Sequence, residues 1–190
     1  MEEKYRQEPS NILKIVLFGP ESTGKTTLSR QLAECYRTEW VPEYAREYLQ
    51  RKWDKEQKVC EPEDLLPIAA GQMRLENEGT KKANKVLFCD TDLLETKVYS
   101  EAYYVGYCDP VLEKYALLNT YDLYFLTGID VPWVKDDLRD KPLERAKMFD
   151  YFKSTLEKYQ RNFVTLTGDK ETRLATAKTH INRLLRTKAI

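Results

Sequence analysis

Two kinds of segment alternate along this chain. Five short apolar runs, each typical of a buried strand, are separated by longer stretches in which apolar residues recur at helical spacing. The strand-like runs are Ile12–Phe18, Glu39–Pro42, Lys85–Cys89, Tyr121–Leu126 and Asn162–Leu166. The helical stretches are Lys25–Arg37, Glu43–Trp53, Glu63–Ala83, Asp92–Gly106, Pro110–Leu118, Leu143–Gln160 and Lys170–Thr187. Strands that alternate with helices form β-α-β units, so we expect an α/β fold with a five-stranded parallel sheet and helices on both of its faces.

The composition fits a single domain over residues 1–190 and excludes several classes of protein. The 31 Lys and Arg residues are balanced by 31 Asp and Glu residues, so the chain lacks the excess positive charge of a general nucleic-acid binder. We interpret the basic residues of the last helical stretch as a solvated helix face. The single histidine excludes a His-rich metal site, and no apolar run is long enough to span a bilayer. We therefore expect a cytoplasmic protein without nucleic-acid or membrane partners.

A phosphate-binding sequence follows the first apolar run. Residues 19–26 read Gly-Pro-Glu-Ser-Thr-Gly-Lys-Thr, which fits G-x-x-x-x-G-K-[ST], with a predicted strand before it and a predicted helix after it. The glycines let successive backbone N–H groups turn toward phosphates at the positive end of a helix. Lys25 is expected to reach the β- and γ-phosphates, and the Thr26 hydroxyl to bind Mg²⁺. The predicted ATP-binding residues of this loop are Gly19, Glu21, Ser22, Thr23, Gly24, Lys25, Thr26 and Thr27.

Two absent motifs narrow the class of phosphate-loop protein. No Asn/Thr-Lys-x-Asp sequence, which reads guanine in GTP switches, follows a late strand. The aspartate after the third run, Asp90, is followed by Thr91 and not by the glutamate that polarises water in ATP-hydrolysing machines. These observations favour a small-molecule kinase. Asp90 is then a candidate Mg²⁺ ligand, with capping of the next helix as its alternative role.

A kinase must also bind an acceptor hydroxyl and place positive charge over the transferred phosphate. Glu43, after the second run, is the candidate base, and Arg46 lies one helical turn on, where it would steady a phosphate or the acceptor. Paired charges on an exposed helix are the alternative. Residues 129–147 are rich in turn and charged residues and are expected to form a lid with Arg139 and Arg145, or else a salt-bridged loop.

Four motifs, in this order, resemble those of the NadR-type nicotinamide riboside kinase domain, a branch of the phosphate-loop kinases. They are residues 19–26, Glu-Tyr-Ala-Arg-Glu-Tyr at 43–48, Ala-Asn-Lys-Val-Leu-Phe-Cys-Asp-Thr-Asp at 83–92 and Pro-Trp-Val-Lys-Asp-Asp-Leu-Arg at 132–139. The resemblance, from about Ile12 to Leu185, implies a nucleoside-kinase architecture and ATP- and Mg²⁺-dependent phosphorylation of the ribose 5′-hydroxyl of nicotinamide riboside, giving nicotinamide mononucleotide.

The residues and the resemblance together assign roles to individual side chains. We expect Lys25, Glu43, Asp90 and Arg139 to be catalytic. The expected substrate-binding residues are Glu43, Arg46, Asp92, Trp40 and Tyr44. The expected metal ligands are Thr26 and Asp90, and further ATP contacts are expected from Arg145, Gly168 and Asp169.

The chain departs from that family at the base-binding position. Many relatives have a tryptophan just before the Glu-Tyr-x-Arg motif, whereas this chain has Pro42, with Trp40 on the same strand face. Tyr103, Tyr104 and Tyr107 are candidate replacements, with core packing as their alternative role. A kinase of another nucleoside or nucleotide therefore remains open, as does a nucleotide-binding regulatory module. The adenylyltransferase activity that some relatives carry on an upstream domain is not expected, because no His-x-Gly-His motif is present.

Overall fold

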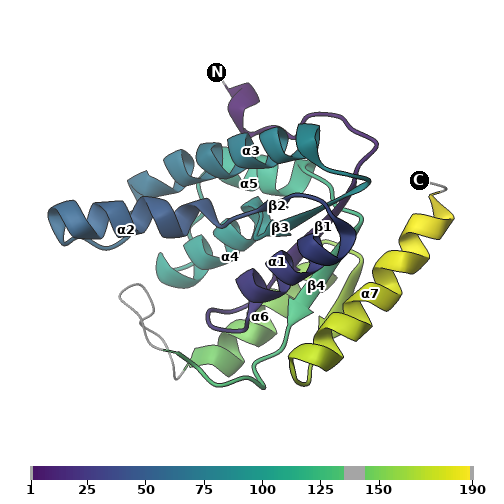
Figure 1. Ribbon diagram of the computed structural model, residues 1–190. Helices are drawn as coiled ribbons and strands as arrows, with labels where there is room; N and C mark the ends of the chain where they lie inside the picture. The colour runs from purple at the N-terminus through teal and green to yellow at the C-terminus, as the bar shows by residue number, and fades with distance from the viewer. Residues whose placement is uncertain (1, 135–143, 189–190) are drawn as a thin grey trace.

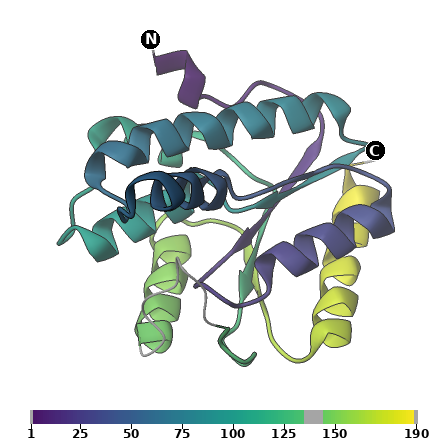
Figure 2. The same ribbon diagram turned by 60° about the vertical axis from the view of Figure 1, so that its left-hand side comes forward.

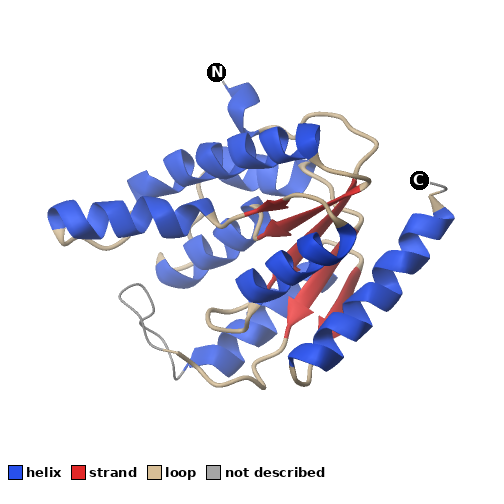
Figure 3. Ribbon diagram, in the orientation of Figure 1, coloured by secondary structure: helices blue, strands red, loops and turns tan. Residues whose placement is uncertain are grey.

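A computed structural model of the chain describes residues 2–134 and 144–188 and has three layers, helices on either side of one sheet (Figures 1 and 3). The strands are β1 (Leu13–Phe18), β2 (Trp40–Val41), β3 (Val86–Asp90), β4 (Leu123–Thr127) and β5 (Phe163–Leu166). The α-helices are α1 (Lys25–Tyr36), α2 (Tyr44–Glu56), α3 (Leu65–Lys82), α4 (Leu93–Tyr103), α5 (Pro110–Leu118), α6 (Arg145–Lys158) and α7 (Lys170–Thr187). Each predicted strand and helix is present with its ends within a few residues. Two short 3-10 helices, η1 (Glu2–Tyr5) and η2 (Pro62–Asp64), were not predicted.

The five strands form one parallel sheet in the order β2-β3-β1-β4-β5, which confirms the predicted fold class. The central strand β1 is buried along its whole length. Leu13, Ile15 and Leu17 face the layer of α1 and α7, whereas Val16 and Phe18 face the layer of α3 to α6. Figure 2 shows α1 and α7 on one side of the strands and α6 on the other. Such two-sided burial explains why β1 reads as a continuous apolar run.

One charge interrupts that run, and the structure pairs it. Lys14 is buried, and its ammonium group lies 3.0 Å from Oε1 of Glu76 in α3. Glu76 also accepts hydrogen bonds from the Gln7 amide (2.8 Å) and from the Tyr121 hydroxyl (2.7 Å). A buried charge needs partners of this kind, so the cluster joins the N-terminal segment to the amino ends of the strands.

The parallel arrangement gathers five loops at one edge of the sheet, because the carboxyl ends of all the strands point the same way. The phosphate loop follows β1, Glu43 follows β2, Thr91 follows β3, Gly128 follows β4 and Gly168 follows β5. Ligands of such sheets bind at this edge, so the fold brings the predicted site residues together. Within the part of the chain that the structure describes, no helix is long and apolar enough to span a membrane.

Candidate active site

The phosphate loop is held in a conformation that depends on glycine at its start. Gly19 has a φ of +137°, and a Cβ atom there would lie 2.8 Å from the Thr127 hydroxyl, so a larger residue does not fit. The Thr23 hydroxyl lies 2.7 Å from that of Thr127 and donates to the Pro20 carbonyl at 2.8 Å, which fixes the loop against β4. Helix α1 begins at Lys25, directly after the loop, so its first N–H groups face the region where phosphates would bind.

The ammonium group of Lys25 lies beneath this loop and is only slightly exposed. It donates to the carbonyls of Gly19 (2.7 Å) and Pro20 (3.1 Å), and it forms an ion pair with Oε1 of Glu95 at 3.1 Å. Burial alone would lower the pKa of Lys25, but the Glu95, Glu43 and Asp90 carboxylates outweigh it and raise that pKa above its ordinary value. Lys25 therefore keeps its positive charge.

The hydroxyl of Thr26 and the carboxylate of Asp90 form the candidate metal site. Thr26 donates to Oδ2 of Asp90 at 2.5 Å, and Oδ1 of Asp90 is buried with no hydrogen-bond partner among the described residues. Burial and the nearby Glu43 carboxylate raise the pKa of Asp90 to about 6, against the opposing charge of Lys25. An unpartnered carboxylate oxygen beside a hydroxyl fits a divalent cation with oxygen ligands such as Mg²⁺. The described residues contain no group of three His, Cys, Asp or Glu side chains for a metal, so the other ligands would come from phosphate and water.

The structure brings Glu43 to this site. Glu43 is half-buried at the N-cap of α2, and its charge affects the pKa values of Lys25, Asp90 and Glu95. Arg46 is exposed one turn further on and lies close enough to lower the pKa of Asp90. The predicted pair after β2 is therefore near the phosphate loop and not on a remote solvated face.

Tyr44 and Trp40 lie in different layers. The Tyr44 ring packs on Gly71 of α3, where a Cβ atom would be 2.0 Å from the ring. The backbone N–H of Tyr44 donates to Oε1 of Gln72 at 2.8 Å. Trp40 instead packs in the core beneath α1, with the Arg30 guanidinium 6.0 Å from its ring centroid. Trp40 lies on β2 and packs toward α1, whereas Tyr44 begins α2 and packs toward α3, so the two rings do not form one aromatic clamp.

Asp92 caps a helix in this structure. It is completely buried, and its two carboxylate oxygens accept hydrogen bonds from the Glu95 N–H (2.9 Å) and the Tyr124 hydroxyl (2.7 Å). It is the N-cap of α4, a role that the sequence analysis gave to Asp90 as an alternative. In this structure Asp92 therefore serves as a helix cap with both carboxylate oxygens bonded, and its part in substrate binding stays a prediction.

The start of the predicted lid lies on the phosphate loop. Val134 N–H donates to the Ser22 hydroxyl at 2.8 Å, and Arg145 donates to the carbonyls of Val131 (3.0 Å) and Ser22 (3.3 Å). Burial lowers the pKa of Arg145, with the charge of Arg173 adding to the effect. The structure therefore brings Arg145 to the phosphate loop, and its contact with ATP stays a prediction; Arg139 lies outside the described residues.

The loop after β5 also reaches the site. Gly168 has a φ of +93°, and Asp169 caps α7 by accepting from Thr172 N–H at 2.8 Å. Arg173, in the first turn of α7, donates to the carbonyls of Thr23 (2.7 Å), Gly168 (2.9 Å) and Gly128 (3.1 Å) and pairs with Asp130. Arg173 is buried, so the interpretation of the basic residues in this segment as a solvated face is wrong at this position.

Glu95 and Arg173 are the polar residues of the site that sequence reasoning missed. Glu95 stands three residues after the N-cap Asp92, a spacing typical of helix starts, and this signal predicts the helix start but not the contact with Lys25. Arg173 is hidden among other basic residues of an amphipathic helix, and the sequence carries no signal that separates it from them. Both act through contacts with loops that are distant in the sequence.

A small aromatic cavity adjoins the phosphate loop. It is lined by Pro20, Glu21, Tyr99, Tyr103, Trp133, Arg145 and Met148. The Tyr99 hydroxyl and the Trp133 indole N–H are buried, and neither has a hydrogen-bond partner among the described residues. Of the three tyrosines that are candidate replacements, Tyr103 is the one that lines this cavity.

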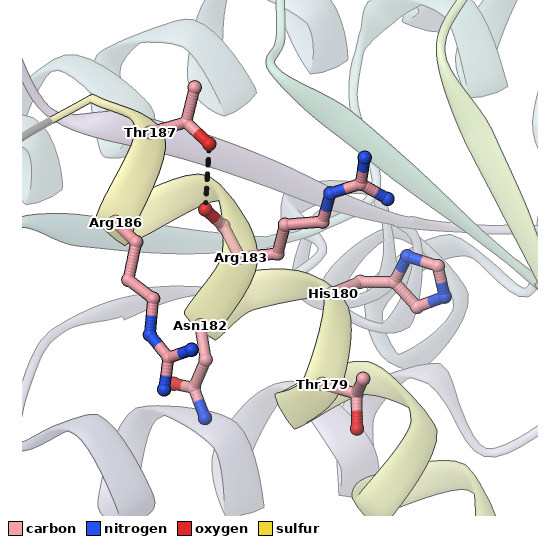
Figure 4. A pocket seen from close by; sticks show the side chains of 6 residues that line it. All are labelled: Thr179, His180, Asn182, Arg183, Arg186 and Thr187. Carbon is pink, nitrogen blue, oxygen red and sulfur yellow. Dashed lines mark hydrogen bonds between the residues drawn. The ribbon is translucent and has the colours of Figure 1, made fainter.

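A wider hollow lies along the C-terminal half of α7 (Figure 4). It is lined by Thr179, His180, Asn182, Arg183, Arg186 and Thr187. All six residues belong to the C-terminal half of one helix, whereas Arg173 and the phosphate loop lie at its other end. The hollow contains none of the predicted site residues and shares no lining residue with the aromatic cavity.

Comparisons with known proteins identify the family of this chain. A family described as "AAA domain" matches residues 14–173. The trifunctional NAD biosynthesis/regulator protein NadR of Salmonella typhimurium is 33% identical over 134 residues, which cover 70% of this chain and 32% of that protein. NadR of Escherichia coli is 30% identical over 161 residues, covering 83% of this chain and 38% of that protein. The chain thus spans about a third of the length of these relatives.

Solved structures show the same fold. A crystal structure of NadR in complex with NR superposes with a TM-score of 0.74 at 21% identity, covering 95% of this chain and 52% of that one. A deoxyadenosine kinase from M. mycoides superposes with a TM-score of 0.64 at 15% identity, covering 90% of this chain and 100% of that one. Taken with the family match over residues 14–173, these findings establish that the chain belongs to the AAA-domain family of phosphate-loop proteins and is a relative of the NadR proteins.

Proposed function

We propose that this chain is an ATP- and Mg²⁺-dependent kinase that phosphorylates the 5′-hydroxyl of a small nucleoside, with nicotinamide riboside as the first candidate acceptor. The observation that carries the proposal is that Lys25, the Thr26–Asp90 pair and Glu43 meet at the carboxyl edge of the sheet. A phosphate-binding lysine, oxygen ligands for a metal and a carboxylate base are the parts that transfer to an alcohol requires.

The proposed roles follow from the positions of the side chains. Lys25 and the N–H groups at the start of α1 bind the phosphates of ATP and offset the negative charge that spreads over the transferred group. Thr26 and Asp90 hold Mg²⁺, which supplies further positive charge to those phosphates when bound. Glu43 accepts the proton of the acceptor hydroxyl, and Arg46 binds the acceptor or the incoming phosphate. Arg145, already on the loop, orients the lid.

The relatives favour nicotinamide riboside as the acceptor. The NadR proteins are described as acting in NAD biosynthesis, and solved structures of NadR hold NR in one case and NAD with AMP-PNP in another. Tyr99, Tyr103 and Trp133 place aromatic surface beside the phosphate loop, but the cavity that they line, at about 10 Å³, is too small for a base. The choice of acceptor therefore rests on the relatives.

A kinase of another nucleoside is the second candidate. This candidate is favoured because Trp40 packs beneath α1. Trp40 therefore does not take the place of the tryptophan that many relatives have before the Glu-Tyr-x-Arg motif.

An acceptor panel tests the proposal. ATP labelled at the γ-phosphate is incubated with the protein, Mg²⁺ and each of a series of nucleosides that includes nicotinamide riboside, and labelled nucleoside monophosphate is quantified. We expect label transfer to nicotinamide riboside, or to one other nucleoside if the second candidate is right, and none with the Lys25→Ala variant. Intact ATP binding without transfer to any acceptor would instead identify a regulatory nucleotide-binding module.

A further inference from the structure

The contacts of Lys25 leave its ammonium group no spare donor. An ammonium group has three N–H donors, and here they face the carbonyls of Gly19 and Pro20 and the carboxylate of Glu95, at 2.7, 3.1 and 3.1 Å. For Lys25 to bind phosphates, at least one of these contacts must be exchanged. When the Glu95 carboxyl is ionised, its contact with Lys25 is the strongest of the three, because both partners are then charged and buried.

Glu95 also holds a second phosphate-binding group. Its Oε2 accepts a hydrogen bond from Gly19 N–H at 3.3 Å, while Oε1 faces Lys25. The carboxylate therefore contacts the phosphate-loop lysine and the first amide of the loop, which are groups that an anionic phosphate would use. Its own backbone is fixed, because Glu95 N–H donates to the N-cap Asp92 at 2.9 Å.

We propose that Glu95 is a positioning residue that holds Lys25 and the Gly19 amide, and that the phosphates of a bound nucleotide compete with its carboxylate for the lysine. The inference rests on the proposed function to the extent that Lys25 binds phosphate. Through Glu95, helix α4 then takes part in nucleotide binding, although none of the four sequence motifs includes this helix.

Moving Lys25 from Glu95 to the phosphates changes which protonation state of Glu95 is favoured. The groups that face Glu95 are Lys25 from α1, Glu43 at the start of α2 and Asp90 at the end of β3. Burial, together with the charge of Glu95, raises the pKa of Tyr99, which lies one turn further along α4. When Lys25 moves to the phosphates, the Glu95 carboxylate keeps two neighbouring carboxylates and loses its cation, so its protonated form becomes favoured.

The rise in the pKa of Glu95 on nucleotide binding sets how nucleotide affinity depends on pH. Burial, opposed by Lys25, already raises the pKa of Glu95 to about 8, and loss of the lysine raises it further. Nucleotide binding therefore takes up a proton at pH values where Glu95 is ionised beforehand, above about pH 8. By linkage, nucleotide affinity falls as the pH rises through this range.

Isothermal titration calorimetry with ADP and Mg²⁺ tests the inference. Titrations at about pH 7 and about pH 9, each in two buffers of different ionisation enthalpy, give the number of protons exchanged on binding. We expect wild-type uptake to be small at the lower pH and to approach one proton at the higher pH. We expect Glu95→Gln to bind ADP about ten-fold more tightly at the higher pH and to lose this uptake.

Glu76 of α3 provides a matched control, because its lysine partner lies at the end of β1 away from the phosphate loop. Glu76 is likewise completely buried and paired with a lysine, Lys14, at 3.0 Å, but it is remote from the phosphate loop. Glu76→Gln removes a buried carboxylate without touching the site, so it is expected to keep the wild-type proton uptake. A merely structural effect of losing a buried charge would change both variants alike.

Two outcomes would overturn the inference. One is an equal proton count for wild type and Glu95→Gln at both pH values while both bind ADP, which would leave the proposed function standing. The other is the absence of ADP binding by the wild type, which would remove the proposed function as well. If Glu95→Gln does not fold, the wild-type profile decides: equal proton counts at the two pH values contradict the exchange.

Discussion

Glu43 illustrates what a single residue contributes at this site. It stands half-buried at the N-cap position of α2 without a side-chain capping hydrogen bond, and its carboxylate acts on the pKa values of Lys25, Asp90 and Glu95. The sequence predicts such a carboxylate because Glu43 directly follows a strand that ends at the ligand edge of the sheet. The sequence does not predict Glu95, because its contact with Lys25 depends on how α4 packs beside the phosphate loop.

The proposed base can be tested without changing the shape of the site. Replacing Glu43 with Gln removes the proton acceptor, so we expect kcat to fall by about 10²- to 10⁴-fold with little change in the affinity for ATP. Steady-state kinetics with the preferred acceptor and a separate ATP titration measure the two effects. Glu47→Gln is the control, since Glu47 is exposed and pairs with Arg51 at 3.0 Å on the same helix. Full turnover by Glu43→Gln would remove Glu43 from this role.

The contact between α2 and α3 shows what the sequence leaves out at the scale of elements. Both helices are predicted from periodicity, but periodicity does not say that the Tyr44 ring packs on Gly71. A glycine inside a helix costs about 1 kcal/mol relative to alanine, so its presence needs a reason, and close approach of an aromatic ring provides one. Nothing in the sequence alone indicates this role for Gly71.

A double-mutant cycle measures this contact. In Gly71→Ala the added Cβ lies 2.0 Å from the position of the Tyr44 ring, which must move, so we expect a loss of about 1 to 3 kcal/mol in the free energy of unfolding. In the Tyr44→Ala background the same change is expected to stabilise by up to about 1 kcal/mol, because the clash is gone and alanine favours the helix. Urea denaturation of the four proteins gives both values. A stabilising Gly71→Ala in the wild-type background would contradict the packing argument.

At the scale of the whole molecule, the order of strands is the feature that the sequence did not predict. The number of strands and their parallel direction follow from the alternation of runs and helices. The order β2-β3-β1-β4-β5 depends on which strands pair across the sheet, and a local pattern of apolar residues does not encode this pairing. The contacts of Arg173 arise from that order, since it reaches loops that follow β1, β4 and β5.

Arg173 is therefore expected to stabilise the carboxyl edge of the sheet as a unit. Arg173→Met removes its contacts with Thr23, Gly168, Gly128 and Asp130 and takes this donor from the buried carbonyls of Thr23 and Gly128. We expect a loss of about 3 kcal/mol in the free energy of unfolding and weaker ADP binding. Denaturant unfolding and calorimetry measure the two effects. The exposed Arg183 on the same helix is the control, and an equally small effect of Arg173→Met and Arg183→Met would refute this role.

The central claim is that this site transfers a phosphate to a nucleoside hydroxyl. The most direct test is ³¹P nuclear magnetic resonance of the products formed from ATP, Mg²⁺ and nicotinamide riboside, or the nucleoside preferred in the acceptor panel. We expect a phosphomonoester signal coupled to the two 5′-methylene protons of the ribose, formed by the wild type and not by Lys25→Ala. Formation of inorganic phosphate alone, or a product signal of equal size with Lys25→Ala, would contradict it.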